Sequence, residues 1–116
     1  MHSTGPRFLG LDVGTQSTKA LVLDVVRGEV VARASAPHTM LGGLPPGHLE
    51  QDPAQWLAAV ATSVRAVLQQ VDPATIAGLA VSGQQHGCVV LDRAGAVVRP
   101  AKLWCDTATV AEAREL

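Results

Sequence analysis

A segment near the start of the chain has residue types suited to binding phosphate and a divalent cation. It runs Asp12-Val-Gly-Thr-Gln-Ser-Thr-Lys19 and directly follows a short apolar stretch. A turn rich in hydroxyls and exposed amides donates hydrogen bonds to phosphate oxygens, and Gly14 permits close approach of the backbone. The Asp12 carboxylate can hold Mg²⁺, often through water. The alternative is a plain polar hairpin whose side chains bond the turn's own backbone, and the spacing leaves both interpretations open. The pattern is neither a Walker loop nor a Rossmann fingerprint.

A second candidate site follows a predicted strand and reads Gly83-Gln-Gln-His-Gly87. The candidate residues are Gln84, Gln85 and His86: amide and imidazole groups offer donors and acceptors that suit hydroxyl groups, and a histidine can also transfer protons. Taken by itself, the segment favours the alternative, a histidine hydrogen-bonded within a turn.

The third candidate site is Trp104-Cys-Asp106, at the end of an apolar stretch. An indole face packs against the apolar C–H face of a sugar, and a polar neighbour can orient the ring. The alternative, which this segment by itself favours, places Trp104 in the core and makes Asp106 the cap of the final helix. We expect His38 and His48, in a Pro/Gly-rich loop, to be solvated.

The elements that must position these segments are predicted from hydrophobic periodicity and turn residues. Strands are expected over residues 8–11, 18–24 and 29–36 as an antiparallel meander, and over residues 76–82. Asp52-Pro53 begins a helix that runs to about residue 70, with Asp52 as N-cap and Gln55 at capping-box spacing. Its apolar stripe is Trp56, Leu57, Val60, Val64, Val67, Leu68 and Val71. The order β-β-β-α-β resembles half of a nucleotide-binding α/β domain.

The last third of the chain is predicted to be mostly extended. Residues 88–91 and 96–99 flank a turn and suggest a hairpin, and residues 101–104 continue extended. A further helix is expected from Thr107 onward, with Thr109 and Glu112 at capping spacing. Nothing after it ends a helix, so we expect the sequence to stop at Leu116 inside an element.

Composition excludes several classes of function. The 116 residues are 47% hydrophobic, enough for one modest core, which excludes a disordered chain. The 9 basic and 10 acidic residues are scattered, which excludes a nucleic-acid or membrane-surface footprint. Cys88 and Cys105 have no metal or disulfide pattern and are expected to be reduced core thiols. The absence of a long apolar run and a start unlike a signal peptide predict a cytoplasmic protein.

Taken together and in this order, four segments resemble the xylulokinase branch of the FGGY family of carbohydrate kinases. They are Phe8-Leu-Gly-Leu-Asp-Val-Gly-Thr-Gln-Ser-Thr-Lys19, Glu50-Gln-Asp-Pro-Ala-Gln-Trp56, Gly83-Gln-Gln-His-Gly87 and Leu103-Trp-Cys-Asp106. Their order and spacing make the resemblance specific, and it covers residues 8–116, with residues 1–7 as a tail. It implies a ribonuclease H-like (actin-like ATPase) α/β domain, with a mixed sheet and flanking helices, of which this chain is the incomplete N-terminal part.

The resemblance also implies a reaction and roles for residues. The γ-phosphoryl group of ATP would be transferred to D-xylulose, giving D-xylulose 5-phosphate, with ATP and Mg²⁺ as cofactors. Asp12 would lie at the Mg²⁺ and phosphate site, directly or through water. The phosphate-contacting turn is matched by Gly14, Thr15, Gln16, Ser17 and Lys19. The sugar contacts are matched by Gln85, His86 and Trp104.

Some features of the resemblance stay open. Gln85 stands where the family more often has Met, and Cys105 where it more often has Asn. Another family kinase, acting on ribulose, glycerol or gluconate, is the first alternative, although glycerol kinases usually carry Arg-Glu at the Gln85-His86 position. A non-catalytic actin-like or sugar-binding module is the second, and Trp104 with that pair argues against it.

In this family the aspartate that takes the acceptor's proton lies well downstream, as do the adenine pocket and the second domain. We therefore expect the 116-residue chain to be inactive by itself. The expected partners are a sugar and ATP, without nucleic acid or membrane, and the oligomeric state is left open between a monomer and a homodimer of the full-length protein.

Overall fold

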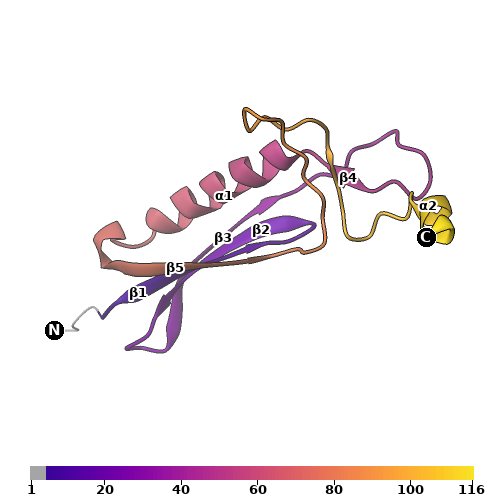
Figure 1. The fold of residues 1–116 in the computed structure, drawn as a ribbon. Coiled ribbons are helices and arrows are strands. Elements are labelled where there is room, and N and C mark those ends of the chain that lie inside the picture. Colours follow the sequence, from indigo (N-terminus) through magenta and orange to yellow (C-terminus); the bar gives the residue numbers. More distant parts are fainter. Residues whose placement is uncertain (1–4) are drawn as a thin grey trace.

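The computed structural model describes residues 5–116, an elongated molecule with extents of 66 × 28 × 25 Å. A sheet and a long helix form one end, and a smaller pair of strands and a short helix form the other (Figure 1). The strands are β1 (Arg7–Val13), β2 (Ser17–Asp24), β3 (Glu29–Pro37), β4 (Glu50–Gln51), β5 (Ile76–Gly83) and β6 (Ala101–Lys102). The helices are α1 (Pro53–Leu68) and α2 (Val110–Glu115), with a short 3₁₀ turn over Pro73–Thr75.

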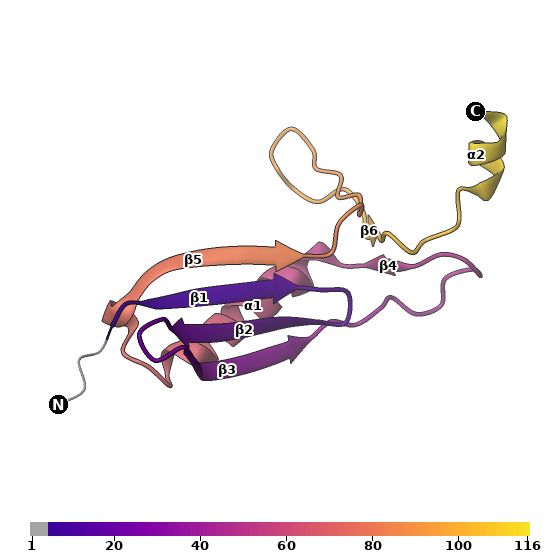
Figure 2. The same cartoon turned by 90° about the horizontal axis from the view of Figure 1, so that it is seen from below.

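The main sheet has the strand order β3-β2-β1-β5 (Figure 2). Strand β1 is antiparallel to β2 and parallel to β5, and β2 is antiparallel to β3. The predicted meander and the mixed sheet are therefore confirmed. The β2–β3 turn closes because the Asp24 carboxylate accepts from the N–H groups of Val26 and Arg27, each at 3.1 Å, and Gly28 adopts a left-handed φ of 66°. The tail expected over residues 1–7 lies partly outside the described residues, and Arg7 already belongs to β1.

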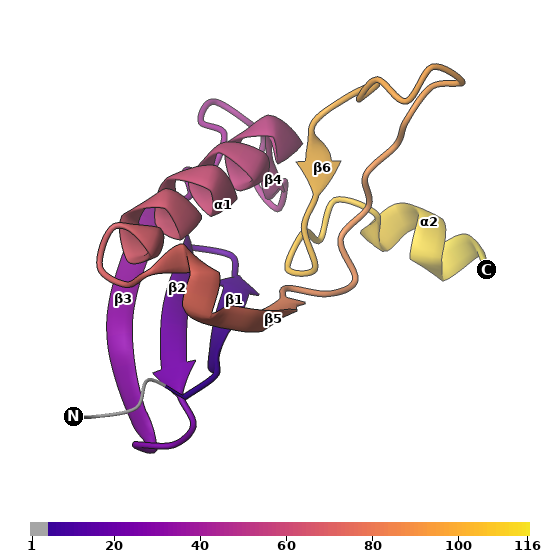
Figure 3. The ribbon, with the colours of Figure 1, turned by 90° about the vertical axis from the view of Figure 1, so that its left-hand side faces the viewer.

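Helix α1 covers one face of the sheet over β2 and β3 (Figure 3). The buried cluster between them is built from small and medium side chains: Leu9, Leu11, Ala20, Val22, Ala32 and Val67. The N-cap prediction is confirmed, because the Asp52 side chain accepts from the N–H of Ala54 at 2.9 Å and Pro53 occupies the first turn. The capping box is wrong: the Gln55 amide bonds the backbone of Thr39 instead.

The predicted stripe of α1 is only partly right. Leu57 is 76% exposed, and the buried helix positions are Pro53, Ala59, Ser63 and Val67. The small side chains of Ala59 and Ser63 let the helix approach the sheet closely, and the Ser63 hydroxyl donates to the carbonyl of Thr18 at 3.4 Å. The sequence prediction counted only large apolar residues and therefore missed this contact through small side chains.

Strand β5 lies beyond the cover of α1 (Figure 3). Leu79 and Val81, which pair in register with the core residues Leu9 and Leu11, are 57% and 62% exposed. The predicted strand is thus confirmed in position, while its apolar side chains on the helix face of the sheet remain uncovered in residues 5–116.

The segment after β5 is less regular than predicted. Residues 88–99 form a loop rather than two regular strands, with isolated antiparallel bridges at Leu91–Val97 and Cys88–Lys102, and Cys88 is exposed rather than in the core. Helix α2 lies away from the main sheet (Figures 1 and 2), and Thr109 makes no side-chain capping bond to it. Neither α1 nor α2 combines the length and apolarity needed to cross a bilayer.

Candidate functional site

The first two predicted segments meet because β1 and β5 are parallel and end at the same edge of the sheet. The Gly14–Ser17 turn follows β1 and the Gln84–Gly87 segment follows β5. The N–H of Gln84 donates to the carbonyl of Val13 at 2.9 Å, joining the two strand ends. A Cβ on Gly83 would stand 2.7 Å from that same carbonyl oxygen, so this close approach requires glycine.

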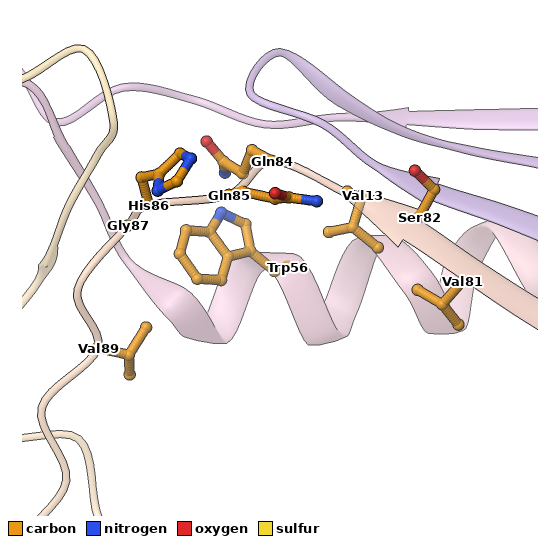
Figure 4. Close-up of a pocket in the computed structure, with 10 residues that line it drawn as sticks. Val13, Trp56, Val81, Ser82, Gln84, Gln85, His86, Gly87 and Val89 are labelled. Carbon is orange, nitrogen blue, oxygen red and sulfur yellow. The ribbon is translucent and has the colours of Figure 1, made fainter.

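Two neighbouring pockets share the Gly83–His86 segment. The first, of about 550 Å³, lies toward α1 and is lined by Val13, Trp56 and Val89 among others (Figure 4). The second, of about 330 Å³, is lined by Asp12, Gly14, Thr15, Gly83, Gln84, Gln85, His86 and Trp104. We take the second as the candidate site, because it brings a carboxylate, a turn and an indole from all three predicted segments together.

Asp12 lies within β1, on the sheet face opposite α1, and is exposed. Across the sheet its register neighbours are Lys19 on β2 and Ser82 on β5. Among residues 5–116 nothing donates a hydrogen bond to its side chain. A single unpaired carboxylate beside the turn after β1 fits Mg²⁺, which usually keeps several waters and takes only one or two carboxylates from the protein. Lys19 lies in β2 rather than in the turn itself.

The turn after β1 presents backbone donors. The N–H of Gly14 donates to the carbonyl of Ser17 at 2.9 Å. In the described part of the chain, the N–H groups of Thr15 and Gln16 have no acceptor. Two adjacent unpaired N–H groups can both donate to an anionic oxygen. This favours an anion-binding turn over the alternative of a plain hairpin that bonds its own backbone.

His38 fixes this turn from behind, and the prediction that it is solvated is wrong. It is 8% exposed, and its Nδ1 donates to the carbonyl of Gly14 at 2.9 Å, which assigns the proton of the neutral ring to Nδ1. Its Nε2 then accepts from the buried hydroxyl of Thr18 at 2.8 Å. The backbone N–H of His38 donates to the carbonyl of Gln16. Strand β3 pairs with β2 up to Pro37, opposite Ser17. This pairing places His38, the next residue, against the turn.

The Thr15 hydroxyl is bonded to protein on two sides. It donates to Oε1 of Gln84 at 3.1 Å and accepts from Nε1 of Trp104 at 2.9 Å. Because a hydroxyl has one proton, this arrangement leaves none for a phosphate oxygen. The donor that Thr15 offers to an anion is therefore its backbone N–H.

Gln85 and His86 are both exposed at the end of β5. His86 has a φ of 66°, the left-handed region that a residue with a Cβ adopts at a cost of about 1 kcal/mol or more. Gly87 follows it. Backbone strain of this kind gathers at binding sites, so the geometry favours a binding role for this segment over an ordinary turn.

Trp104 is 57% exposed, which rules out its placement in the core. Asp106 does not cap α2, which begins only at Val110; its carboxylate instead accepts from the N–H groups of Ala108 at 2.9 Å and Leu49 at 2.8 Å. These two backbone bonds lower the pKa of Asp106. The segment that bears the indole is thus tied to the chain that precedes α1.

A set of ion pairs also joins the segment that bears Trp104 to the chain that precedes α1. Glu50 is buried and pairs with the guanidinium of Arg99 and with Nζ of Lys102 at 3.3 Å, and the hydrogen bond from Arg99 is the main cause of its lowered pKa. Lys102 also reaches Asp106 at 3.4 Å, and His48 lies 3.6 Å from Glu50. The cluster of His48, Glu50 and Asp106 has the ligand types of a metal site, but its two carboxylates are already paired with the cations of Arg99 and Lys102.

Gln51 was missed by sequence reasoning. It is fully buried beneath the candidate site, and Gln84, which belongs to the second predicted segment, bonds both Thr15 and Gln51. Gln51 precedes a helix cap, and its position carries no local pattern that distinguishes it.

Comparison with known proteins identifies relatives over nearly the whole chain. The sequence profile of the N-terminal domain of the FGGY family of carbohydrate kinases matches residues 7–116. A xylulose kinase of Streptomyces rubiginosus is 44% identical over 112 residues, covering 97% of this chain and 22% of the relative. The chain thus spans about a fifth of the length of that relative.

Solved structures give the same result. The xylulose kinase of Rhodospirillum rubrum superposes with a TM-score of 0.82 at 34% identity, over 94% of this chain and 23% of that one. A gluconate kinase of Lactobacillus acidophilus superposes with a TM-score of 0.86 at 25% identity, over 95% and 22%. These similarities confirm the predicted fold class, a ribonuclease H-like domain of the actin-like ATPase type, present in part.

Proposed function

Because the chain belongs to the FGGY family of carbohydrate kinases, we propose that it supplies one side of the active site of an ATP-dependent xylulose kinase. The proposed reaction transfers the γ-phosphoryl group of ATP to D-xylulose, giving D-xylulose 5-phosphate and ADP. The observation that carries the proposal is the shared pocket that is lined by Asp12, by Gly14 and Thr15 of the turn, by Gln85-His86 and by Trp104.

The phosphate side of the proposed site is the turn after β1. The unpaired N–H groups of Thr15 and Gln16 would bind phosphate oxygens, joined by Ser17 and by Lys19, which lies in β2 in register with Asp12. Asp12 would hold Mg²⁺, whose positive charge would offset the charge of the phosphoryl group. Positioning and charge stabilisation are the main needs of phosphoryl transfer, and this half of the site supplies both.

The sugar side of the proposed site is the Gln84–Gly87 segment with Trp104. The exposed indole offers an apolar face to the C–H face of a sugar, and its N–H is already bonded to Thr15, so the ring is held in one orientation. Gln85 and His86 offer an amide and an imidazole to sugar hydroxyls. No carboxylate other than Asp12 lines this pocket, and we propose that the group that accepts the sugar's proton lies in a further part of the protein.

The choice of sugar rests on sequence similarity more than on fold. The fold similarity is as close for the gluconate kinase of Lactobacillus acidophilus as for the xylulose kinase of Rhodospirillum rubrum, but sequence identity is higher to the xylulose kinases of Rhodospirillum rubrum and Streptomyces rubiginosus. We therefore propose D-xylulose, in a cytoplasmic enzyme, and take gluconate, ribulose and glycerol as the competing substrates that the assay must include.

The proposal is tested on the full-length gene product with D-xylulose, D-ribulose, glycerol and D-gluconate. We expect the highest kcat/KM with D-xylulose, and a loss of at least about 100-fold in kcat for Asp12→Asn. Because Asp12 is exposed, its replacement should change the free energy of unfolding by no more than about 0.5 kcal/mol. Glu29→Gln, an exposed carboxylate at the start of β3, is the matched control and should keep full activity. Undiminished turnover by Asp12→Asn would refute the role given to Asp12.

A further inference from the structure

Gln51, in β4, is a polar side chain that is completely buried. Its amide uses both ends: Nε2 donates to the backbone carbonyl of Thr15 at 2.7 Å, and Oε1 accepts from Nε1 of Trp56 at 2.8 Å. Burying an amide is costly unless its groups are paired, and here they are. The question is what this buried amide does for the site above it.

The amide closes a ring of hydrogen bonds through three residues. Gln51 Nε2 bonds the carbonyl of Thr15, the Thr15 hydroxyl bonds Oε1 of Gln84 at 3.1 Å, and Nε2 of Gln84 returns to Oε1 of Gln51 at 3.4 Å. Each corner of the ring comes from a different element: β4, the turn after β1 and the end of β5. Trp104 joins it from outside through the Thr15 hydroxyl.

The orientation of the Gln51 amide is determined by its partners. An indole N–H only donates, so the atom that faces Trp56 must be the oxygen, and a carbonyl only accepts, so the atom that faces Thr15 must be the nitrogen. Both conditions are met by the same orientation. The ring therefore has one hydrogen-bonding pattern and holds its corners in one arrangement.

We infer that Gln51 is a positioning residue that sets the separation between the phosphate-binding turn, through Thr15, and the sugar-binding segment, through Gln84. The inference rests on the proposed function of these two segments. In phosphoryl transfer the acceptor hydroxyl and the γ-phosphate must be aligned, and a displacement of about 1 Å costs about 100-fold in rate. Gln51 touches neither reactant and acts through the two segments that do.

Gln51→Met tests the inference, because methionine is similar in length but has no amide to bond Thr15 or Gln84. We expect kcat for D-xylulose to fall about 10- to 100-fold, while KM for D-xylulose and for ATP changes by less than about 3-fold. Ser63→Ala is the matched control: Ser63 is another fully buried polar residue, on α1, and bonds Thr18 outside the ring. It should lower the melting temperature but leave kcat unchanged.

Gln51→Glu adds a readout that a merely structural role would not give. The buried carboxylate would face the Thr15 carbonyl with two acceptors and repel it, whereas the protonated acid has the donor and acceptor pattern of the amide. We expect the kcat of Gln51→Glu, relative to the parent, to rise as the pH falls from about 8 to about 6, because burial raises the pKa of such an acid. Ser63→Ala should show the parent's profile.

Gln84→Met breaks the ring at a half-buried corner and serves if Gln51→Met does not fold. It should lower kcat by a similar factor. The inference would be overturned if the parent phosphorylates D-xylulose and Gln51→Met, or Gln84→Met in its place, has the same kcat as Ser63→Ala. That result would leave the proposed function intact. A parent that phosphorylates none of the sugars would overturn both.

Discussion

Gly83→Ala tests the contact that joins the two halves of the proposed site. A Cβ at this position would stand 2.7 Å from the carbonyl oxygen of Val13, where ordinary carbon–oxygen contacts begin near 3.4 Å. The obstacle is backbone and cannot rotate away, so the ends of β1 and β5 must separate by several tenths of an ångström. The hydrogen bond from Gln84 to Val13 would lengthen from 2.9 Å. Overpacking of this kind costs about 1–3 kcal/mol of stability.

The effect on activity follows from the place of the contact. The displaced strand ends carry the turn on one side and Gln85-His86 on the other, so we expect kcat/KM of the full-length gene product to fall about 10-fold or more. Gly78→Ala is the matched control at the other end of β5, where the added Cβ would stand 3.2 Å from the ring of Phe8, a side chain rather than backbone and 40% exposed. Urea unfolding and steady-state kinetics measure both effects. Equal kcat/KM values for the two variants would refute the reasoning.

Two further predictions concern His86 and three carboxylates. His86→Gly should raise the free energy of unfolding by up to about 1 kcal/mol, because glycine adopts a φ of 66° without strain, while kcat/KM falls through loss of the imidazole; a loss of stability would contradict the strain. The pKa values of three carboxylates are lowered by hydrogen bonds: that of Asp24 mainly by the backbone N–H of Arg27, and that of Glu50 mainly by the Arg99 side chain. The pKa of Asp106 is lowered by the backbone N–H groups of Ala108 and Leu49. Their ionised forms therefore stabilise the fold above the unfolded-state pKa values of about 4, and this stability is lost as the pH falls through the lower native values. Urea unfolding between pH 6 and pH 3 should show the decline, less steeply in Asp24→Asn, and a midpoint independent of pH would contradict it.

The main elements could be predicted because their signals are local. Alternation of apolar residues and turn glycines indicate β1 to β3, and Asp52-Pro53 marks the start of α1. Leu57 shows the limit of such patterns: it fits the stripe but is exposed, because the sheet beneath α1 is approached by Ala59 and Ser63 instead. Which side of a helix packs depends on a surface that its own sequence does not contain.

The candidate site was predicted by residue type but not by its bonding. Asp12, Gln85, His86 and Trp104 carry recognisable chemistry at the ends of elements, and all four line one pocket. His38 and Gln51 contribute through contacts with residues 20 or more positions away along the chain, and such contacts depend on strand register and on where a loop returns. The role of the Thr15 side chain changed for the same reason, since its hydroxyl is taken by Gln84 and Trp104.

The parallel pairing of β1 with β5 has an evolutionary consequence. It separates the residue that the backbone needs at the strand end, Gly83, from the exposed residues that follow it, Gln85 and His86. Substitutions at Gln85, and at His86 by residues that tolerate its left-handed φ of 66°, change the exposed surface with little loss of folding stability, whereas a change at Gly83 affects both strands. Under the proposed function, a lineage can therefore vary its ligand preference at the end of one strand while it keeps the adjoining turn unchanged.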